Sequence, residues 1–245
     1  MNPKISIVTV VYNSKDLIEH TIISVLEQSF QDFEFIVVDG ASKDGTLEVI
    51  NKYKHKISKI ISEKDKGIYD AMNKGLNLAS GDYILYLNSG DEFFDRTTLE
   101  KVLTSTNDAD IVYGKTSVIG NDRGIIGDAR LKPPHKLSWK SLQYGMCVCH
   151  QSFIPKRSLC KPYDLSFKIS SDIDWVISIL KEAKVVQYYD GYISKFLVGG
   201  TSTKNKYKSW RERFKILSKH YGVFKTAINH IYIASRYFFL RNDFQ

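Results

Sequence analysis

The chain has 245 residues, of which 43% are hydrophobic, and a formal net charge of +8. This length supports one sizeable core, and α/β chains of this size are commonly a single domain. The excess charge lies in residues 204–245, where ten Lys and Arg face only Glu212 and Asp243, so the rest of the chain is neutral and carries no nucleic-acid footprint.

The amino terminus reaches its first strand pattern within a few residues, without the apolar stretch of a secretory signal. The chain has three cysteines, an odd number, and Cys147 and Cys149 are one residue apart, which argues against a disulfide framework. Both observations predict a cytoplasmic protein with reduced thiols.

The first ninety residues alternate between strand and helix patterns. Nearly continuous β-branched runs are typical of parallel strands buried on both faces. Apolar residues at helical spacing lie between these runs, and alternating strands and helices predict a parallel sheet with right-handed crossovers. The predicted strands are 5–12, 35–38, 59–62 and 83–87, and the predicted helices are 16–28, one that opens at 44–46, and 67–79.

Acidic residues follow three of these strands, namely Asp39, Asp65 and Asp91. Carboxyl ends of parallel strands meet at one edge of a sheet, where such folds bind ligands. One aspartate could hydrogen-bond a base or ribose and another could hold a cation bridging two phosphates, although a single one could be a cap or turn residue. The chain lacks Gly-x-Gly-x-x-Gly and Walker-type loops, which argues against dinucleotide oxidoreductases and P-loop kinases.

Beyond residue 100 the pattern changes to strands with longer connections, with one clear helix over 172–184. The segment Cys147-Val-Cys-His150 resembles half of a zinc site but has no second ligand pair at suitable spacing. If this segment is a strand, both cysteines face one side and His150 the other.

The tail carries apolar residues that step by four and three, a pattern that predicts a helical seam with a break at Gly222. With its basic flanks the seam suits a membrane interface, but a helical hairpin packed on the body would show the same pattern. It would also accept a partner helix, so the oligomeric state stays open. The seam consists of Trp210, Phe214, Leu217, Tyr221, Phe224, Ile228, Ile231, Ser235 and Phe238.

Four ordered segments resemble family 2 glycosyltransferases. They are Ser6-Ile-Val-Thr-Val-Val-Tyr-Asn13, Val37-Val-Asp-Gly-Ala-Ser-Lys-Asp-Gly-Thr46, Gly67-Ile-Tyr-Asp-Ala-Met-Asn-Lys-Gly75 and Leu85-Tyr-Leu-Asn-Ser-Gly-Asp91. The resemblance implies an α/β fold of the GT-A type, with a catalytic domain over 1–203 and a helical extension over 204–245. Within the domain, 1–92 would bind the nucleotide sugar and 93–203 the acceptor.

The resemblance also implies roles for individual residues. Tyr12, Asp39, Asp65, Lys66 and Ser89 would contact the donor. The family's Asp-x-Asp type motif falls on residues 88–91. Only Asp91 retains the carboxylate that ligates Mn²⁺ or Mg²⁺, because Asn88 replaces the first aspartate.

A looser resemblance covers residues 145–202. Asp172 matches the family's general base, and Asp174, two residues on, is the alternative; Asp172 could also simply cap its helix. Contacts to the acceptor or diphosphate would come from His150 and from the loop of Gly199, Gly200 and Thr201. A structural histidine and an ordinary turn are the respective alternatives.

The implied reaction is inverting transfer of galactose or glucose from a UDP-sugar to a polyprenyl-diphosphate-linked sugar, in O-antigen or other surface-polysaccharide assembly. The enzyme would sit on the inner face of the cell membrane, held by its basic tail. Three alternatives remain: a sugar-nucleotide pyrophosphorylase, which the Tyr12-Asn-Ser14 loop disfavours, a non-catalytic nucleotide-sugar-binding protein, and a transferase with a non-lipid acceptor.

Overall fold

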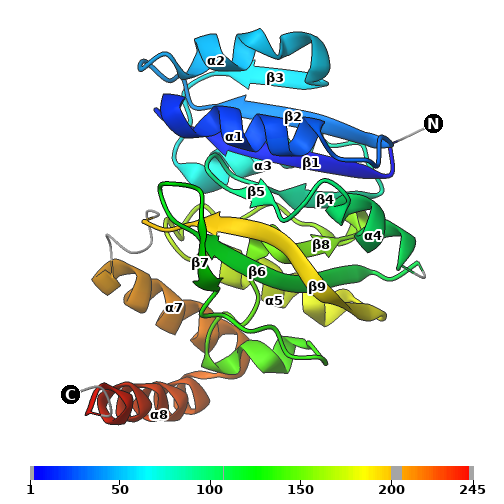
Figure 1. The fold of residues 1–245 in the computed structure, drawn as a ribbon. Helices are drawn as coiled ribbons and strands as arrows, with labels where there is room; N and C mark the ends of the chain where they lie inside the picture. Colours follow the sequence, from blue (N-terminus) through cyan, green and yellow to red (C-terminus); the bar gives the residue numbers. More distant parts are fainter. Residues whose placement is uncertain (1–2, 107, 200–205, 243–245) are drawn as a thin grey trace.

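The computed structural model describes residues 3–106, 108–199 and 206–242. Two β-sheets lie beside one another, with helices packed around them, and the last two helices lie at the end of the molecule opposite α2 (Figure 1). The three cysteines are free. No helix within the described residues is long and apolar enough to cross a bilayer.

The first sheet is parallel throughout and has the strand order β3-β2-β1-β4. Because its strands are apolar on both faces, helices cover both sides. Alternate residues of the first strand point to two cores: Ile5 and Ile7 join one, and Val8 and Val10 the other. The elements are β1 (Ile5–Val11), α1 (Lys15–Leu26), β2 (Phe33–Asp39), α2 (Thr46–Lys52), β3 (Lys59–Ser62), α3 (Ile68–Leu78) and β4 (Tyr83–Tyr86).

Helix α3 approaches the sheet closely because residue 75 is glycine. A Cβ atom on Gly75 would lie 2.4 Å from Cγ1 of Val8, so any larger residue would push the helix outward. Met72 and Leu76 on this helix are buried against the even-numbered residues of β1. The close packing fixes the start of α3 near the carboxyl edge of the sheet.

The second sheet is mixed, as expected for the predicted acceptor half. β6 pairs parallel with β9 and antiparallel with β7 and β8, while β5 pairs antiparallel with β9. Single-turn 3-10 helices occupy 54–56, 150–152 and 157–159, and a longer one 139–144. The elements are β5 (Glu92–Phe93), α4 (Thr98–Thr104), β6 (Ile111–Ile119), β7 (Ile125–Asp128), β8 (Phe153–Pro155), α5 (Ser171–Glu182) and β9 (Val186–Leu197).

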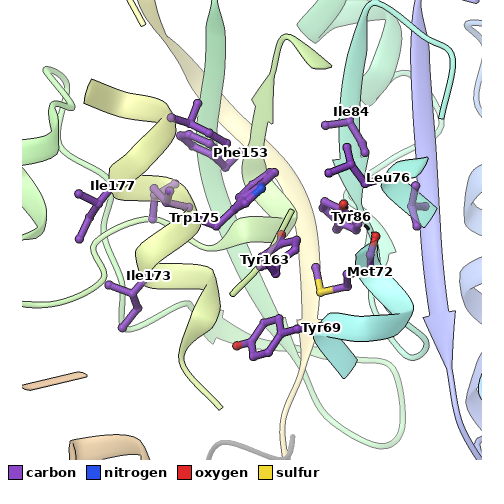
Figure 2. Close-up of a cluster of buried hydrophobic side chains, with 14 of the residues drawn as sticks. Tyr69, Met72, Leu76, Ile84, Tyr86, Phe153, Tyr163, Ile173, Trp175 and Ile177 are labelled. Carbon is purple, nitrogen blue, oxygen red and sulfur yellow. Dashed lines mark hydrogen bonds between the residues drawn. The ribbon is translucent and has the colours of Figure 1, made fainter. Parts of the chain in front are cut away.

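An aromatic cluster joins the two halves of the body, residues 3–92 and 93–199 (Figure 2). The ring of Tyr163 stacks on Trp175 of α5 at 4.9 Å between centroids and on Tyr69 of α3 at 5.3 Å. Tyr86 of β4 contacts Trp175 edge-on at 5.6 Å. Because α3 and β4 belong to the first half and α5 to the second, both halves share one core, which holds the start of α5 at a fixed place relative to the first sheet.

The tail forms two helices, α7 (Lys206–Tyr221) and α8 (Val223–Asn242), which separate at Gly222 as predicted. Gly222 has a φ of +85°, a left-handed conformation that favours glycine. The predicted seam is not one continuous face. Leu217 is buried in the core together with Ile216, whereas Trp210, Phe224 and Ile228 are exposed, so only part of the seam packs on the body. The side chains of Ser235 and Phe238 lie outside the described part of the structure.

Glu34 anchors the start of the first sheet from a buried position on β2. Its carboxylate accepts hydrogen bonds from Ser6 Oγ at 2.6 Å, from Lys59 Nζ at 2.9 Å and from the backbone N–H groups of Ser80 and Gly81. Burial alone would raise the pKa of Glu34, but these bonds outweigh it and lower the pKa to about 2.

We expect Glu34→Gln to lower the free energy of unfolding by about 2 kcal/mol at pH 7, with allowance for screening at the partly exposed Lys59. Since the pKa of Glu34 in the folded protein lies below its ordinary value of 4.5, this stabilisation is complete above pH 4.5 and is lost as the pH falls toward 2. Urea unfolding of both proteins at pH 7 and pH 3 would check it. A difference that does not shrink at pH 3 would mean that packing, and not charge, causes the loss.

Candidate active site

The predicted donor residues lie together at the carboxyl edge of the first sheet. Asp39 ends β2 and is fully buried; its carboxylate accepts hydrogen bonds from Ser42 and from Ser62 Oγ at 2.6 Å. Tyr12 follows β1 and is exposed. A Cβ atom on Gly40 would lie 3.2 Å from the Tyr12 ring and 2.4 Å from the Asp65 carboxylate, so these two side chains flank Gly40.

Lys66 extends this edge beyond Asp65 and is exposed. Its backbone N–H donates to Asp70, and the N–H of Gly67 donates to Asp65 at 2.8 Å. These bonds form the turn that begins α3 and fix the Asp65 carboxylate beside Gly40. The edge therefore presents an aromatic ring after β1, and a carboxylate and an ammonium group on adjacent residues after β3.

A cavity of about 360 Å³ opens between the two sheets and the start of α5. Its lining comes from loops after β4 and β9, from α3, from the 3-10 helix at 150–152 and from α5. Gly200 and Thr201, which were predicted to contact the acceptor or diphosphate, lie outside the described residues. The predicted site residues that line this cavity are Ser89, Asp91, His150, Asp172 and Gly199.

Asp172 lies in the first turn of α5, with its side chain partly open to the cavity. The Tyr69 hydroxyl lies 3.1 Å from Asp172 Oδ1 and 2.9 Å from the Ile169 carbonyl oxygen, so it can donate to either. Burial and the nearby Asp172 charge raise the pKa of Tyr69 well above its ordinary value, which keeps this hydroxyl a donor. The second carboxylate oxygen of Asp172, Oδ2, faces His150.

His150 lies between Asp172 and Asn88. Its Nδ1 is 3.9 Å from Asp172 Oδ2, and its Nε2 is 3.1 Å from Asn88 Nδ2. Burial lowers the pKa of His150, despite the opposing effect of Asp172, which favours the neutral ring. Because Asn88 Nδ2 can only donate, Nε2 must accept, and the ring proton belongs on Nδ1, facing Asp172.

Asp174, the alternative base, faces away from the cavity. It is buried against α7, where its carboxylate lies 2.6 Å from His220 Nε2 and 3.0 Å from Lys219 Nζ. Burial raises the pKa of Asp174, but the bonds from His220 and Lys219 outweigh it, so the net shift is downward. Asp174 fastens α7 to α5, and of the two aspartates only Asp172 lines the cavity.

Asp91 lies on the opposite wall and is 5% exposed. Its carboxylate accepts hydrogen bonds from Gln151 Nε2 at 2.8 Å and from the backbone N–H of Leu197 at 3.1 Å. Burial nevertheless raises the pKa of Asp91 to about 7. A nearby positive charge would stabilise the ionised form of this buried carboxyl group.

The cavity contains oxygen ligands suited to a hard divalent cation. Asn88 Oδ1 is buried without a hydrogen-bond partner, and Asn88 and Asp91 line the same cavity. Within the described residues no group of three or more His, Cys, Asp or Glu side chains could hold a metal alone. Mg²⁺ and Mn²⁺ are commonly bound by one or two carboxylates together with substrate phosphates, and the residues present fit that arrangement.

Two residues that sequence reasoning did not single out hold the predicted carboxylates: Gln151 bonds Asp91, and Tyr69 bonds Asp172. Gln151 follows His150, and Tyr69 lies in the segment that starts at Gly67. Their positions within these two segments are the sequence signal that could have identified them. The strand considered for the segment that starts at Cys147 does not form. Residues 145–149, all described, form no strand, and a 3-10 helix starts at His150.

Comparison with known proteins gives consistent matches. The model of glycosyl transferase family 2 matches residues 6–163. A PGL/p-HBAD biosynthesis glycosyltransferase of Mycobacterium bovis is 28% identical over 196 residues, covering 76% of this chain and 73% of that protein. The Escherichia coli UDP-Glc:alpha-D-GlcNAc-diphosphoundecaprenol beta-1,3-glucosyltransferase WfgD is 27% identical over 217 residues, covering 87% and 85%.

Among solved structures, Staphylococcus aureus TarS in complex with UDP-GlcNAc superposes with a TM-score of 0.71 at 20% identity. The superposition covers 87% of this chain and 64% of that structure, so the chain spans less than two thirds of this neighbour. At this identity the likeness concerns the fold, and it confirms the arrangement expected from the sequence.

Proposed function

The chain belongs to glycosyl transferase family 2, and from this we propose that it transfers a hexose from a UDP-sugar to a lipid-diphosphate-linked sugar, with inversion at the anomeric carbon. One observation carries the proposal. The cavity holds a carboxylate, Asp172, on one wall and the buried Asp91 with Ser89 on the other. A single displacement needs a base beside the attacking hydroxyl and other groups beside the departing diphosphate, and the two walls would supply them.

In the proposed reaction the acceptor hydroxyl enters beside Asp172. Its oxygen forms a bond to the anomeric carbon while the bond from that carbon to the UDP oxygen breaks, and UDP leaves with the electron pair. The proton of the hydroxyl passes to Asp172. Tyr69 holds Oδ1 of this carboxylate at 3.1 Å, so Oδ2 is the proton acceptor. Attack on the face opposite UDP inverts the configuration.

Asn88 and Asp91 would hold Mn²⁺ or Mg²⁺ together with the donor's phosphates. The cation would supply positive charge at the departing diphosphate. The protein residues do the rest: Gln151 and the Leu197 N–H keep the Asp91 carboxylate oriented, and Ser89 lines the cavity beside it.

Tyr12, Asp39, Asp65 and Lys66 would bind the nucleotide at the carboxyl edge of the first sheet. Support comes from the Tyr12 ring and the Asp65 carboxylate, which approach the backbone of Gly40 closely because this residue has no side chain. The named donor of the E. coli relative, UDP-Glc, supports uracil as the base. Lys66 would add a cation near the phosphates.

Two observations support the proposed lipid-linked acceptor: the surface of the tail, and the E. coli relative, whose name specifies a diphosphoundecaprenol-linked sugar. Phe224, Ile228 and Ile231 lie one turn apart on α8 and are 90%, 67% and 71% exposed. Lys225 lies among them, and α7 adds an exposed Trp210. Exposed apolar residues with basic neighbours suit the surface of an anionic bilayer, where a polyprenyl acceptor would be anchored.

We expect the triple variant Phe224→Ser, Ile228→Ser and Ile231→Ser to bind anionic vesicles at least about tenfold more weakly, because it removes three apolar contacts with the acyl region. Co-sedimentation with phosphatidylglycerol vesicles measures the change. The matched control is Ile125→Ser with Ile126→Ser, which removes exposed apolar residues from β7 and should leave binding unchanged. Equal binding of the triple variant and the wild type would contradict a lipid-facing α8.

The test of the proposed function is UDP release from a panel of UDP-, GDP- and dTDP-sugars with a polyprenyl-diphosphate N-acetylglucosamine acceptor, in Mn²⁺ or EDTA. Acceptor-dependent UDP release with an inverted product is the expected result. Nucleotide binding without turnover on this acceptor or on soluble sugar acceptors would instead support a non-catalytic binding protein.

A further inference from the structure

A buried carboxylate on the tail helix caps the segment that carries Asp172. Glu212 of α7 is 8% exposed. Its Oε1 accepts the backbone N–H of Lys168 at 2.9 Å, and its Oε2 accepts those of Ile169 at 2.8 Å and Ser170 at 3.0 Å. Among the described residues no ion pair joins a basic side chain to Glu212, so its charge is balanced by peptide N–H groups of the turn that precedes α5.

The capped residues belong to the cavity. Lys168 and Ile169 line it, and Asp172 follows Ser170 by two residues. The Tyr69 hydroxyl lies 3.1 Å from Asp172 Oδ1 and 2.9 Å from the Ile169 carbonyl oxygen, so it contacts both the carboxylate and the turn. Glu212 therefore binds the N–H side of a turn whose carbonyl side is held by Tyr69. A shift of this turn would move both a wall of the cavity and the carboxylate of Asp172.

Other residues of α7 also pack against the turn before α5 and the core. Ser209, one turn before Glu212, places its Oγ 3.2 Å from Ser170 Oγ, and both serines are buried. Further along α7, Ile216 is buried in the core. A helix that served only to reach a membrane would not need a buried carboxylate, because such a group is costly unless its hydrogen bonds are satisfied. Here three backbone donors satisfy it.

We infer that Glu212 is a positioning residue for transfer: it fixes residues 168–170 so that Asp172 and the adjoining acceptor wall reach their reactive geometry. The inference rests on the proposed function. It assigns the tail a share in building the site, in addition to any role in binding lipid. If Glu212 only attached α7 to the body, its substitution would lower stability and leave the kcat of the folded protein unchanged.

The test is Glu212→Gln in the full chain. The variant keeps the size of the side chain but places an amide N–H₂ group against backbone donors. We expect kcat to fall about 10- to 100-fold, the range that small displacements of reacting groups produce, with the dissociation constant of UDP unchanged. Amide hydrogen exchange in residues 164–173 should accelerate, and Glu212→Asp, which restores a carboxylate, should recover part of kcat.

Two variants serve as controls. Glu182→Gln removes the same charge from an exposed ion pair with Lys161 and should leave kcat and exchange unchanged. Asp174→Asn loosens the same pair of helices away from the cavity and should lower Tm without lowering kcat. A Glu212→Gln protein that is folded and fully active, or a loss of kcat matched by Asp174→Asn, would overturn the inference. A wild-type chain without acceptor-dependent UDP release would refute the proposed function, and the inference would fall with it.

Discussion

Asp172→Asn should lower kcat by about 10²- to 10⁴-fold, the usual contribution of a positioned general base, while UDP binds as it does to the wild type. Asparagine has the same shape as aspartate but cannot take the proton of the acceptor hydroxyl. Tyr69 can still donate to its amide oxygen, so the start of α5 should stay in place. Initial rates of UDP release at saturating donor and acceptor, with calorimetric titration of UDP, separate the two effects.

The matched control is Asp174→Asn, the same substitution two residues along the same helix. Asp174 contacts Lys219 and His220 and does not line the cavity, so this variant should lose stability and keep its kcat at temperatures well below its Tm. An Asp172→Asn protein that retains wild-type kcat would refute Asp172 as the base. If Asp174→Asn alone abolished transfer, the assignment of the two aspartates would be reversed.

Asp91→Asn should lower kcat/KM by about 10²-fold or more, because it removes the carboxylate that lines the cavity together with Asn88, where a cation would lie at the departing diphosphate. The second readout is binding: Mn²⁺ should strengthen UDP binding to the wild type and have little effect on the variant. Calorimetric titration of UDP with and without Mn²⁺ measures this directly and does not require turnover.

Asp82→Asn is the control for the loss of an acidic side chain, since Asp82 is an exposed partner of Lys4 at the other edge of the sheet. It should preserve both activity and the effect of Mn²⁺. Persistent enhancement of UDP binding by Mn²⁺ in Asp91→Asn would show that the cation binds elsewhere or through the phosphates alone.

The nucleotide half could be predicted closely from the sequence because its signals are local. The run 59–62 is a strand over those same residues, and the predicted helix over 67–79 forms over Ile68–Leu78. β-branched strands and amphipathic helices bury side chains according to their own periodicity. The carboxyl ends of parallel strands then bring Asp39 and Asp65 to one edge without further information.

The tail could not be predicted to the same extent. Apolar residues at helical spacing serve a protein core and a lipid surface equally well, and only the folded chain shows that Leu217 is buried while Phe224 is exposed. Likewise, a helix places residues two apart on opposite faces, so Asp172 and Asp174 had to differ in surroundings. Which of them faced a cavity depended on α7, a contact some 45 residues away in sequence.

The hydrogen bonds from Glu212 to the turn before α5 also set an order of events during synthesis. The three capped N–H groups precede Glu212 by 42 to 44 residues. At about 5 to 20 residues per second, a ribosome needs roughly 2 to 9 seconds to add that stretch. A nascent chain can therefore complete its first sheet and still lack the turn beside Asp172. Transfer activity should appear only once α7 has left the ribosome, so incomplete chains would not consume nucleotide sugar.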